Sequence, residues 1–276
     1  APAQWLDSAI RAGAYGVVTK RQSAANGINQ FLAGYFSAEN MRFRAEALSF
    51  QVSVQDAQLA EAQAATGGGP GAAAVDKDGK KMSKSIGNIV NPYDVFDHIG
   101  ADPLRWYFLA RLAPESQKRI SVDIVREVAS SFVNTLWNTY GFFTLYASLD
   151  EIDLSKDVAL ADRPEIDRWA LALAHHTVHT VTAAMDAYDA RGAGQAVETF
   201  VDQLSNWYIR RNRRRFWKSE AGADKQSAYL TLYQCLDTLQ RLIAPFMPFL
   251  AEAMYQNLVC SRDPDAPISV HMSEWP

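Results

Sequence analysis

Helical spacing of apolar residues dominates the chain after Ser121. In the first such segment, expected to run from Val122 to about Tyr146, apolar side chains recur in steps of three, four and seven residues. Ser121 precedes it as an N-cap residue, since its hydroxyl can accept from a free backbone amide of the first turn. One face of such a helix is apolar and must be buried against another element. The pattern therefore predicts helix packed on helix.

Similar segments follow along the chain. They are expected over residues 166–188, from Val197 to about Trp217, over residues 224–244 and over residues 249–259. Gly192 and Gly194 are predicted to break the chain between the first two of them. Several helices of about 20 residues joined by short loops predict a mainly α fold, an antiparallel helical bundle over residues 121–276.

Composition divides the rest of the chain into three parts. Residues 1–65 are rich in Ala and Gln, show helical tendency and have no assigned family. Residues 66–75 are Gly-rich and predict a flexible linker. Residues 76–120 begin with a polar loop, and short helices are expected to start at Asn91-Pro92 and at Asp102-Pro103.

The bulk composition indicates a cytoplasmic protein with no membrane partner. The chain is 48% hydrophobic and 21% charged, as is typical of soluble globular proteins. No apolar stretch approaches the ~20 residues of a membrane span, and the N-terminus lacks a secretory signal pattern. Cys235 and Cys260 are too far apart for a metal-binding or redox pair and are expected to be buried thiols in a reducing compartment.

The polar loop, called the lysine loop below, is suited to binding a polyphosphate. Its centre, Lys81-Met82-Ser83-Lys84-Ser85, offers lysine charges and serine hydroxyls to phosphate oxygens, within a stretch flanked by Gly79 and Gly87. Met82 is expected to anchor the loop on an apolar surface. The alternative for the pentapeptide alone is an ordinary solvated lysine loop.

Positive charge gathers on one predicted helix, although the net charge is −4. The basic residues occupy neighbouring turns with aromatic residues between them. They are Arg210, Arg211, Arg213, Arg214, Arg215 and Lys218, and the aromatic residues are Trp207, Tyr208, Phe216 and Trp217. One interpretation is a face that follows RNA phosphates, with Trp207 available for stacking. The other is that the aromatic residues are core and several arginines pair with carboxylates such as Asp202, Asp186 or Asp189.

Two histidine patterns favour structural roles. His175 and His179 share a helix face with His176 beside them, but no third ligand is evident, so no metal site is predicted. His98-Ile99-Gly100-Ala101 lies after the lysine loop and is interpreted as a structural turn.

From Asp76 onward the chain resembles the class I aminoacyl-tRNA synthetases, because Lys81–Ser85 matches the KMSKS signature of that family and further motifs follow in order. These motifs are Gly100–Tyr107, Leu136–Tyr140, Asp167–Trp169, Leu204–Arg211, Arg213–Trp217, Ala244–Phe249 and Ser269–His271. The valyl and leucyl relatives share the lysine loop, but Ser205–Tyr208 leading into the arginine run is similar to the isoleucyl branch.

The resemblance implies a ligase that activates isoleucine with ATP and transfers it to tRNA(Ile). Lys84 and Lys81 would be catalytic, and Lys81, Met82, Ser83, Lys84 and Ser85 would form the ATP-binding loop, with Mg2+ expected on the nucleotide. The arginine run and Trp207 would contact tRNA along the anticodon stem. No DNA partner and no structural metal are implied.

The chain departs from the family before the lysine loop. Residues 1–65 contain neither the family's other ATP signature nor a nucleotide-binding β/α pattern. Isoleucine would therefore be bound only through a missing catalytic half, and the isolated chain is expected to be inactive. The alternatives are a stand-alone tRNA-binding module, a valyl- or leucyl-type fragment, and a helical interaction protein.

Overall fold

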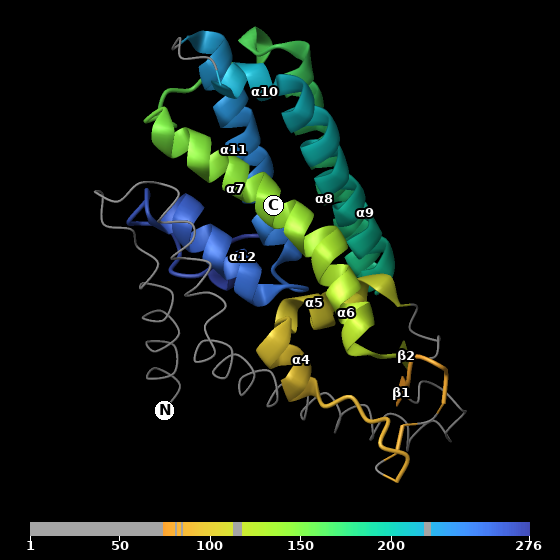
Figure 1. The fold of residues 1–276 in the computed structure, drawn as a ribbon. Helices are drawn as coiled ribbons and strands as arrows, with labels where there is room; N and C mark the ends of the chain where they lie inside the picture. Colours follow the sequence, from red (N-terminus) through yellow and green to blue (C-terminus); the bar gives the residue numbers. More distant parts are fainter. Residues whose placement is uncertain (1–73, 81, 84, 113–117, 218–221) are drawn as a thin grey trace.

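The computed structural model describes residues 74–276 except 81, 84, 113–117 and 218–221 (Figure 1). The predictions for residues 1–65, and those for the linker up to residue 73, lie outside the described residues. The described part is mainly α, as predicted. The helices of its bundle are α6 (Val122–Val128), α7 (Asn134–Leu149), α8 (Glu165–Asp186), α9 (Ala190–Asp202), α10 (Arg210–Trp217), α11 (Ala223–Ile243) and α12 (Pro248–Tyr255).

Three of these helices are extended through π-helical turns. The α6 helix continues through η2 (Ala129–Val133) into α7, and α9 continues through η4 (Gln203–Ile209) into α10. The α12 helix runs on into η5 (Gln256–Cys260). Ser121 caps the first of these, because its hydroxyl accepts a hydrogen bond from the Ile124 amide at 3.2 Å.

A smaller unit precedes the bundle. It contains the strands β1 (Ala74–Val75) and β2 (Lys118–Arg119), which pair in parallel, and the helices α4 (Pro92–His98) and α5 (Ala101–Trp106), the latter extended by η1 (Tyr107–Arg111). Asn91 caps α4 through a bond from the Tyr93 amide, as the Asn-Pro pair predicts. Residue spacing does not predict the strands, since two residues are too few to show a period.

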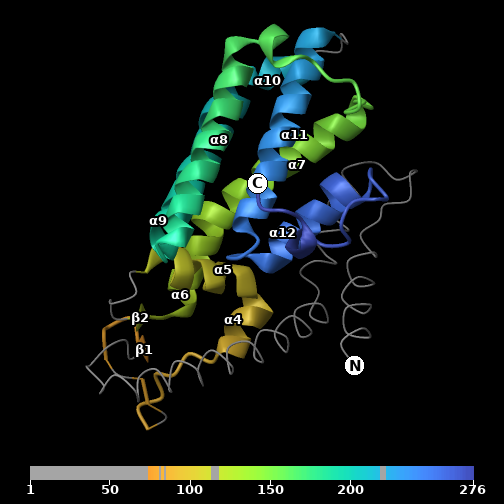
Figure 2. The ribbon, with the colours of Figure 1, turned by 180° about the vertical axis from the view of Figure 1, so that it is seen from behind.

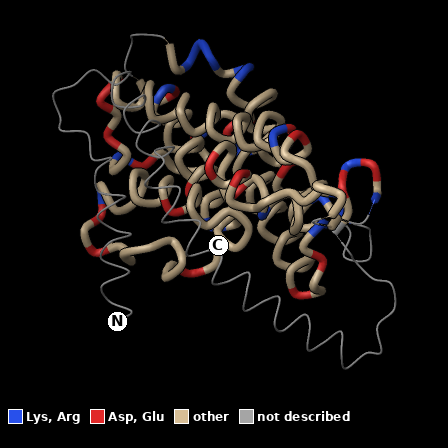
Figure 3. The backbone as a smooth tube through the Cα atoms, turned by 60° about the horizontal axis from the view of Figure 1, so that its bottom comes forward, with Lys and Arg blue, Asp and Glu red and all other residues tan. Residues whose placement is uncertain are grey.

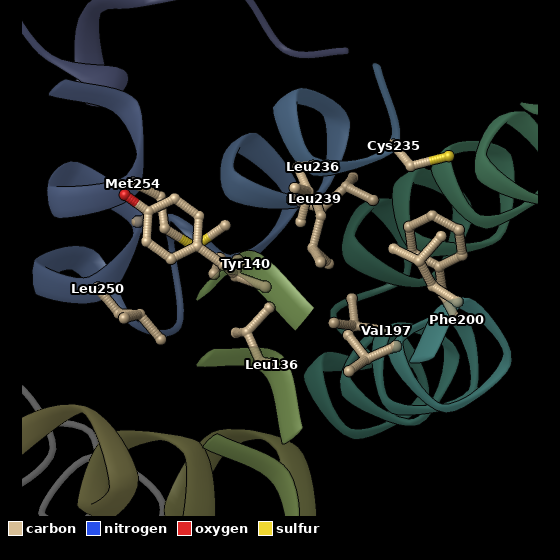
Figure 4. Close-up of a cluster of buried hydrophobic side chains, with 14 of the residues drawn as sticks. Leu136, Tyr140, Val197, Phe200, Cys235, Leu236, Leu239, Leu250 and Met254 are labelled. Carbon is tan, nitrogen blue, oxygen red and sulfur yellow. The ribbon is translucent and has the colours of Figure 1, made fainter. Parts of the chain in front are cut away.

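The bundle core lies where α7, α9, α11 and α12 face one another (Figures 1 and 2). Figure 4 shows its centre, to which Leu136 and Tyr140 come from α7, Val197 and Phe200 from α9, Leu236 and Leu239 from α11, and Leu250 and Met254 from α12. Cys235 is buried in the same core and its pKa is raised to about 12 by burial, whereas Cys260 is only partly buried, contrary to expectation.

The prediction that Gly192 and Gly194 break a helix is wrong, because both lie inside α9. The chain turns earlier, where Tyr188 has a φ of 59° and the Asp189 carboxylate caps α9 by accepting from the Gly192 amide at 2.8 Å. A Cβ on Gly194 would lie 2.3 Å from Cβ of Ala110. Glycine is therefore needed for the close approach of α9 to η1, not for a turn.

Candidate nucleic-acid interface and lysine loop

The lysine loop starts directly after β1 and leads into α4. Lys81 and Lys84 lie outside the described residues. Between them, Ser83 is partly exposed, and its hydroxyl lies 3.1 Å from that of Ser85, which is exposed. Met82 packs against a small buried cluster that contains Val95 and Phe96, as expected of an apolar anchor.

The two ends of the loop are joined by side chains to which residue spacing assigns no role. The Asp76 carboxylate accepts a hydrogen bond from Nδ2 of Asn88 at 2.8 Å, and Oδ1 of Asn88 accepts one from the Ser83 amide at 2.9 Å. A signal was available in the sequence. An aspartate three residues before a glycine is typical of a tight turn stabilised by its own carboxylate.

Four arginines of α10 face solvent. Arg210, Arg211, Arg213 and Arg214 are all exposed, and none of them forms an ion pair with a carboxylate in the part of the chain that the structure describes. The helix contains no acidic residue, so its outer face is uniformly positive, and Figure 3 shows it as blue segments at one end of the molecule. Lys218 lies outside the described residues.

One exposed tryptophan precedes this helix and another is its last residue. The guanidinium of Arg211 lies 4.4 Å from the ring centroid of Trp207, and that of Arg213 lies 6.0 Å from the centroid of Trp217. Both rings remain about half exposed, at 50% for Trp207 and 56% for Trp217. Each pair therefore offers a cation and an open aromatic surface side by side.

Arg215 differs from its neighbours because it points into the bundle. Its guanidinium donates to both carboxylate oxygens of the fully buried Asp167, at 2.6 and 2.8 Å, and pairs with Asp224 at 2.9 Å. Burial by itself lowers the pKa of Arg215, but hydrogen bonding and charge attraction from Asp167 outweigh it and raise that pKa. This geometry gives Arg215 an internal structural role.

Asp167 is the centre of a buried polar network. Besides Arg215, it accepts hydrogen bonds from the hydroxyls of Tyr208 (2.7 Å) and Ser227 (2.6 Å), which joins α8, η4 and α11. Burial, followed by the neighbouring Asp167, raises the pKa of Tyr208 well above its usual value. The sequence held a signal for this role, since Asp167 shares its helix face with the buried Ala170 and Ala174.

The carboxylates named as alternative partners do not pair with the α10 arginines in the described part of the chain, and two of them have other roles. Asp202 accepts from the side-chain amide of Asn206 at 2.7 Å, and Asp189 caps α9. Neither these nor Asp186 pairs with an α10 arginine among the described residues. The interpretation that some arginines pair with carboxylates is correct for Arg215. Its partners are Asp167 and Asp224, however, and not the carboxylates that were named.

A groove lies beside the exposed arginines, between α7 and the η4–α10 helix. Its cavity volume is about 340 Å3, and its walls present polar and apolar surface in nearly equal amounts. The lining residues are Asn138, Thr139, Phe142, Ser205, Asn206, Ile209, Arg210 and Arg213. The groove therefore combines guanidinium, amide and hydroxyl groups with an apolar patch from Phe142 and Ile209.

The histidines of α8 do not form a ligand cluster in the structure. His175, His176 and His179 are exposed, and the described residues contain no group of three or more His, Cys, Asp or Glu side chains that could hold a metal ion. His98 ends α4, where Nδ1 lies 2.7 Å from the Asp94 carbonyl oxygen. Among the helices of the described part, none is long and apolar enough to span a membrane.

Two family models match the chain. Residues 72–121 match "tRNA synthetases class I (I, L, M and V)", and residues 167–276 match "Anticodon-binding domain of tRNA ligase". The isoleucine–tRNA ligase of Deinococcus radiodurans is 52% identical over 202 residues, and that of Thermus thermophilus is 48% identical over 203 residues. Each alignment covers 73% of this chain but only 18% and 20% of the relative, so the chain spans about a fifth of the length of these proteins.

Solved structures share the fold at low sequence identity. Mycobacterium tuberculosis methionyl-tRNA synthetase in complex with methionyl-adenylate gives a TM-score of 0.54 at 21% identity, over 71% of this chain and 42% of that one. An Agrobacterium radiobacter LeuRS in a ternary complex with tRNA and LeuAMS gives 0.52 at 20% identity, over 75% of this chain and 23% of that one.

Proposed function

Residues 72–276 of this chain belong to the class I aminoacyl-tRNA synthetases, and we propose that they form the lysine loop and the tRNA-binding helical bundle of an isoleucine–tRNA ligase. The whole protein would activate isoleucine with ATP, releasing pyrophosphate, and then transfer the aminoacyl group to tRNA(Ile). Identity near 50% with isoleucine–tRNA ligases favours the isoleucyl assignment over the valyl or leucyl one.

The RNA-binding part of the proposal rests on the exposed arginines of α10, called the arginine row below. Arg210, Arg211, Arg213 and Arg214 are exposed and without described carboxylate partners, so they remain available to phosphates. Trp207 presents half of its ring beside Arg211, as a surface on which an unpaired base can stack. Arg215 is left out of this surface, because Asp167 already engages it.

The groove beside the row supports the same assignment. Arg210 and Arg213 form part of its wall together with amide and hydroxyl side chains, which are groups that hydrogen-bond to bases and ribose. RNA phosphates on the row would bring adjacent nucleotides to this groove.

The lysine loop is proposed to contact the phosphates of ATP. Lys84 and Lys81 would stabilise the negative charge that builds up on the leaving pyrophosphate, since positioned cations act most strongly where charge develops. Ser83 and Ser85 would donate hydrogen bonds to phosphate oxygens. Mg2+ would enter on the nucleotide, because this ion is commonly bound by substrate phosphates with only one or two carboxylates.

A salt series of tRNA binding tests the proposal. Replacing Arg210, Arg211 and Arg214 together by Gln should weaken binding, and should reduce the slope of log affinity against log salt by between about 2 and 3, at ~0.7 to 0.9 for each phosphate that an arginine no longer neutralises. A matched control removes three exposed arginines elsewhere, at Arg126, Arg191 and Arg262, and should leave the slope unchanged. Equal slopes for the α10 variant and the unaltered chain would contradict the assignment.

A further inference from the structure

We propose that Asp76 and Asn88 are positioning residues for the lysine loop, which together hold its two ends in the arrangement needed for phosphate contact. The inference rests on the proposed function of the loop. It adds two residues that touch neither phosphate nor amino acid but act through the residues between them.

Asp76 organises the first side of the loop through its carboxylate. Oδ1 accepts hydrogen bonds from the backbone amides of Asp78 at 3.0 Å and Lys80 at 2.8 Å, and the Asp76 amide donates to the Lys80 carbonyl at 2.9 Å. Gly79 completes this turn with a φ of 79°, in the left-handed region that favours glycine. The residue just before Lys81 is therefore held by Asp76.

Asn88 ties the second side to the first. Its Nδ2 donates to Oδ2 of Asp76 at 2.8 Å, across twelve residues of chain, while its Oδ1 accepts from the Ser83 amide at 2.9 Å. Hydrogen bonds from Asn88 and from the two backbone amides lower the pKa of Asp76, the Asn88 bond being the largest cause. One side chain thus joins both ends of the loop and a residue in its middle.

Both ends are fixed in the fold. Asp76 directly follows β1, which is paired with β2, and the Ile120 amide donates to the Val75 carbonyl at 3.0 Å. Asn88 is three residues before the Asn91 cap of α4, whose Val95 and Phe96 are buried in the smaller core cluster. The Asp76–Asn88 pair is therefore the point at which the loop is joined to ordered structure on both sides.

The chemistry of the pair is directional, and this makes it testable. Asp76 acts only as an acceptor, with both oxygens in use, whereas Asn88 acts as donor and acceptor at once. Asp76→Asn leaves only one acceptor oxygen, so either the turn or the bond to Asn88 is lost. Asn88→Asp places two carboxylates against each other. The exchange of both, Asp76→Asn with Asn88→Asp, restores a donor–acceptor match between the two side chains.

The experiment measures ATP–pyrophosphate exchange by the full-length synthetase that contains this segment. Each single variant should lower kcat at least tenfold, the order expected when a catalytic group is misplaced by a fraction of an ångström, with KM for isoleucine within about twofold of the unaltered enzyme. The exchanged pair should recover to within about threefold of the unaltered kcat. Rates are referred to the folded fraction, measured by circular dichroism.

Asp78→Asn is the matched control. It removes the same charge two residues away, from an exposed aspartate whose backbone amide, not its carboxylate, takes part in the turn, and should leave kcat unchanged. An exchanged pair no better than the single variants would overturn the inference, as would unchanged rates for the singles. Lys84→Ala distinguishes failure of this inference from failure of the proposed function of the loop. A normal exchange rate in Lys84→Ala would reject the proposed contact between the loop and the phosphates of ATP.

Discussion

At the scale of single residues, environment separates arginines that composition treats alike. Arg211 and Arg215 lie one helical turn apart on α10, yet Arg211 is exposed over Trp207 while Arg215 is engaged by Asp167. Because residues four apart lie on nearly the same side of a helix, the difference comes from the partner within reach, which for Arg215 is the buried Asp167 of α8. The positive face is therefore made of the arginines that have no inward partner.

This contrast predicts unequal costs for two aspartates that pair with the same arginine. Asp167→Asn should lower the free energy of unfolding by about 3 kcal/mol, the order expected when one partner of a buried ion pair is removed. Asp224→Asn, whose side chain is 64% exposed, should cost less than about 1 kcal/mol. Urea unfolding of the chain followed by circular dichroism compares them, and similar losses would show that burial does not decide the strength of the pair.

At the scale of elements, polar side chains of the short helices bond to the helices of the bundle. The Asp102 carboxylate of α5 accepts from the Leu250 amide at 2.7 Å, at the start of α12. Trp106 donates to the Glu198 carboxylate of α9 at 2.7 Å, through its indole nitrogen. The short helices after the lysine loop are thereby joined to the bundle by specific polar contacts as well as by apolar packing.

The contact between α9 and η1 gives a prediction for Gly194, and Gly141 in α7, which lies outside this contact, serves as a comparison. Gly194→Ala should destabilise the protein by about 1–3 kcal/mol, because the new methyl group would overlap the side chain and backbone of Ala110. In Gly141→Ala of α7, no heavy atom beyond the adjoining residues and the backbone of the helix itself lies within 4 Å of the added Cβ, and the change should stabilise the helix by about 0.5–1 kcal/mol. Thermal unfolding should therefore shift in opposite directions, and a shift of the same sign in both would contradict the close-packing argument.

At the scale of the whole molecule, the arginine row and the lysine loop lie at opposite ends of the described structure, α10 at the top and the β1–β2 region at the bottom of Figure 1. The bundle between them is continuous, since one large cluster of buried side chains includes Trp106 of α5 and Phe216 of α10. The proposed division of labour follows, with RNA phosphates bound at one end and nucleotide phosphates at the other.

This division predicts separable activities. The chain alone should bind tRNA yet show no measurable ATP–pyrophosphate exchange, because activation requires ATP and isoleucine to be held together. In the full-length protein, Lys84→Ala should slow exchange by about 10²-fold or more while tRNA affinity stays unchanged. Exchange by the isolated chain, or a loss of tRNA binding on Lys84→Ala, would contradict the division.

The sequence by itself predicted most helices of the bundle and indicated the two candidate sites. Apolar spacing placed the helix from Val122 and the one through Trp217, and the caps at Ser121 and Asn91, because these signals act within one or two turns of the chain. The ordered motifs likewise identified the lysine loop and the arginine run, because a motif is a property of the sequence alone.

Only the tertiary structure decided which side chains of a run face inward and which distant residues meet. The inward turn of Arg215 to Asp167, the close approach of Gly194 to Ala110 and the bond between Asp76 and Asn88 each depend on residues 12 to 84 positions apart. The physical reason is that a hydrogen bond or a steric contact depends on distance in space, which local periodicity does not encode. The sequence pattern predicted a positive face on α10, but packing decided which of its arginines belong to that face.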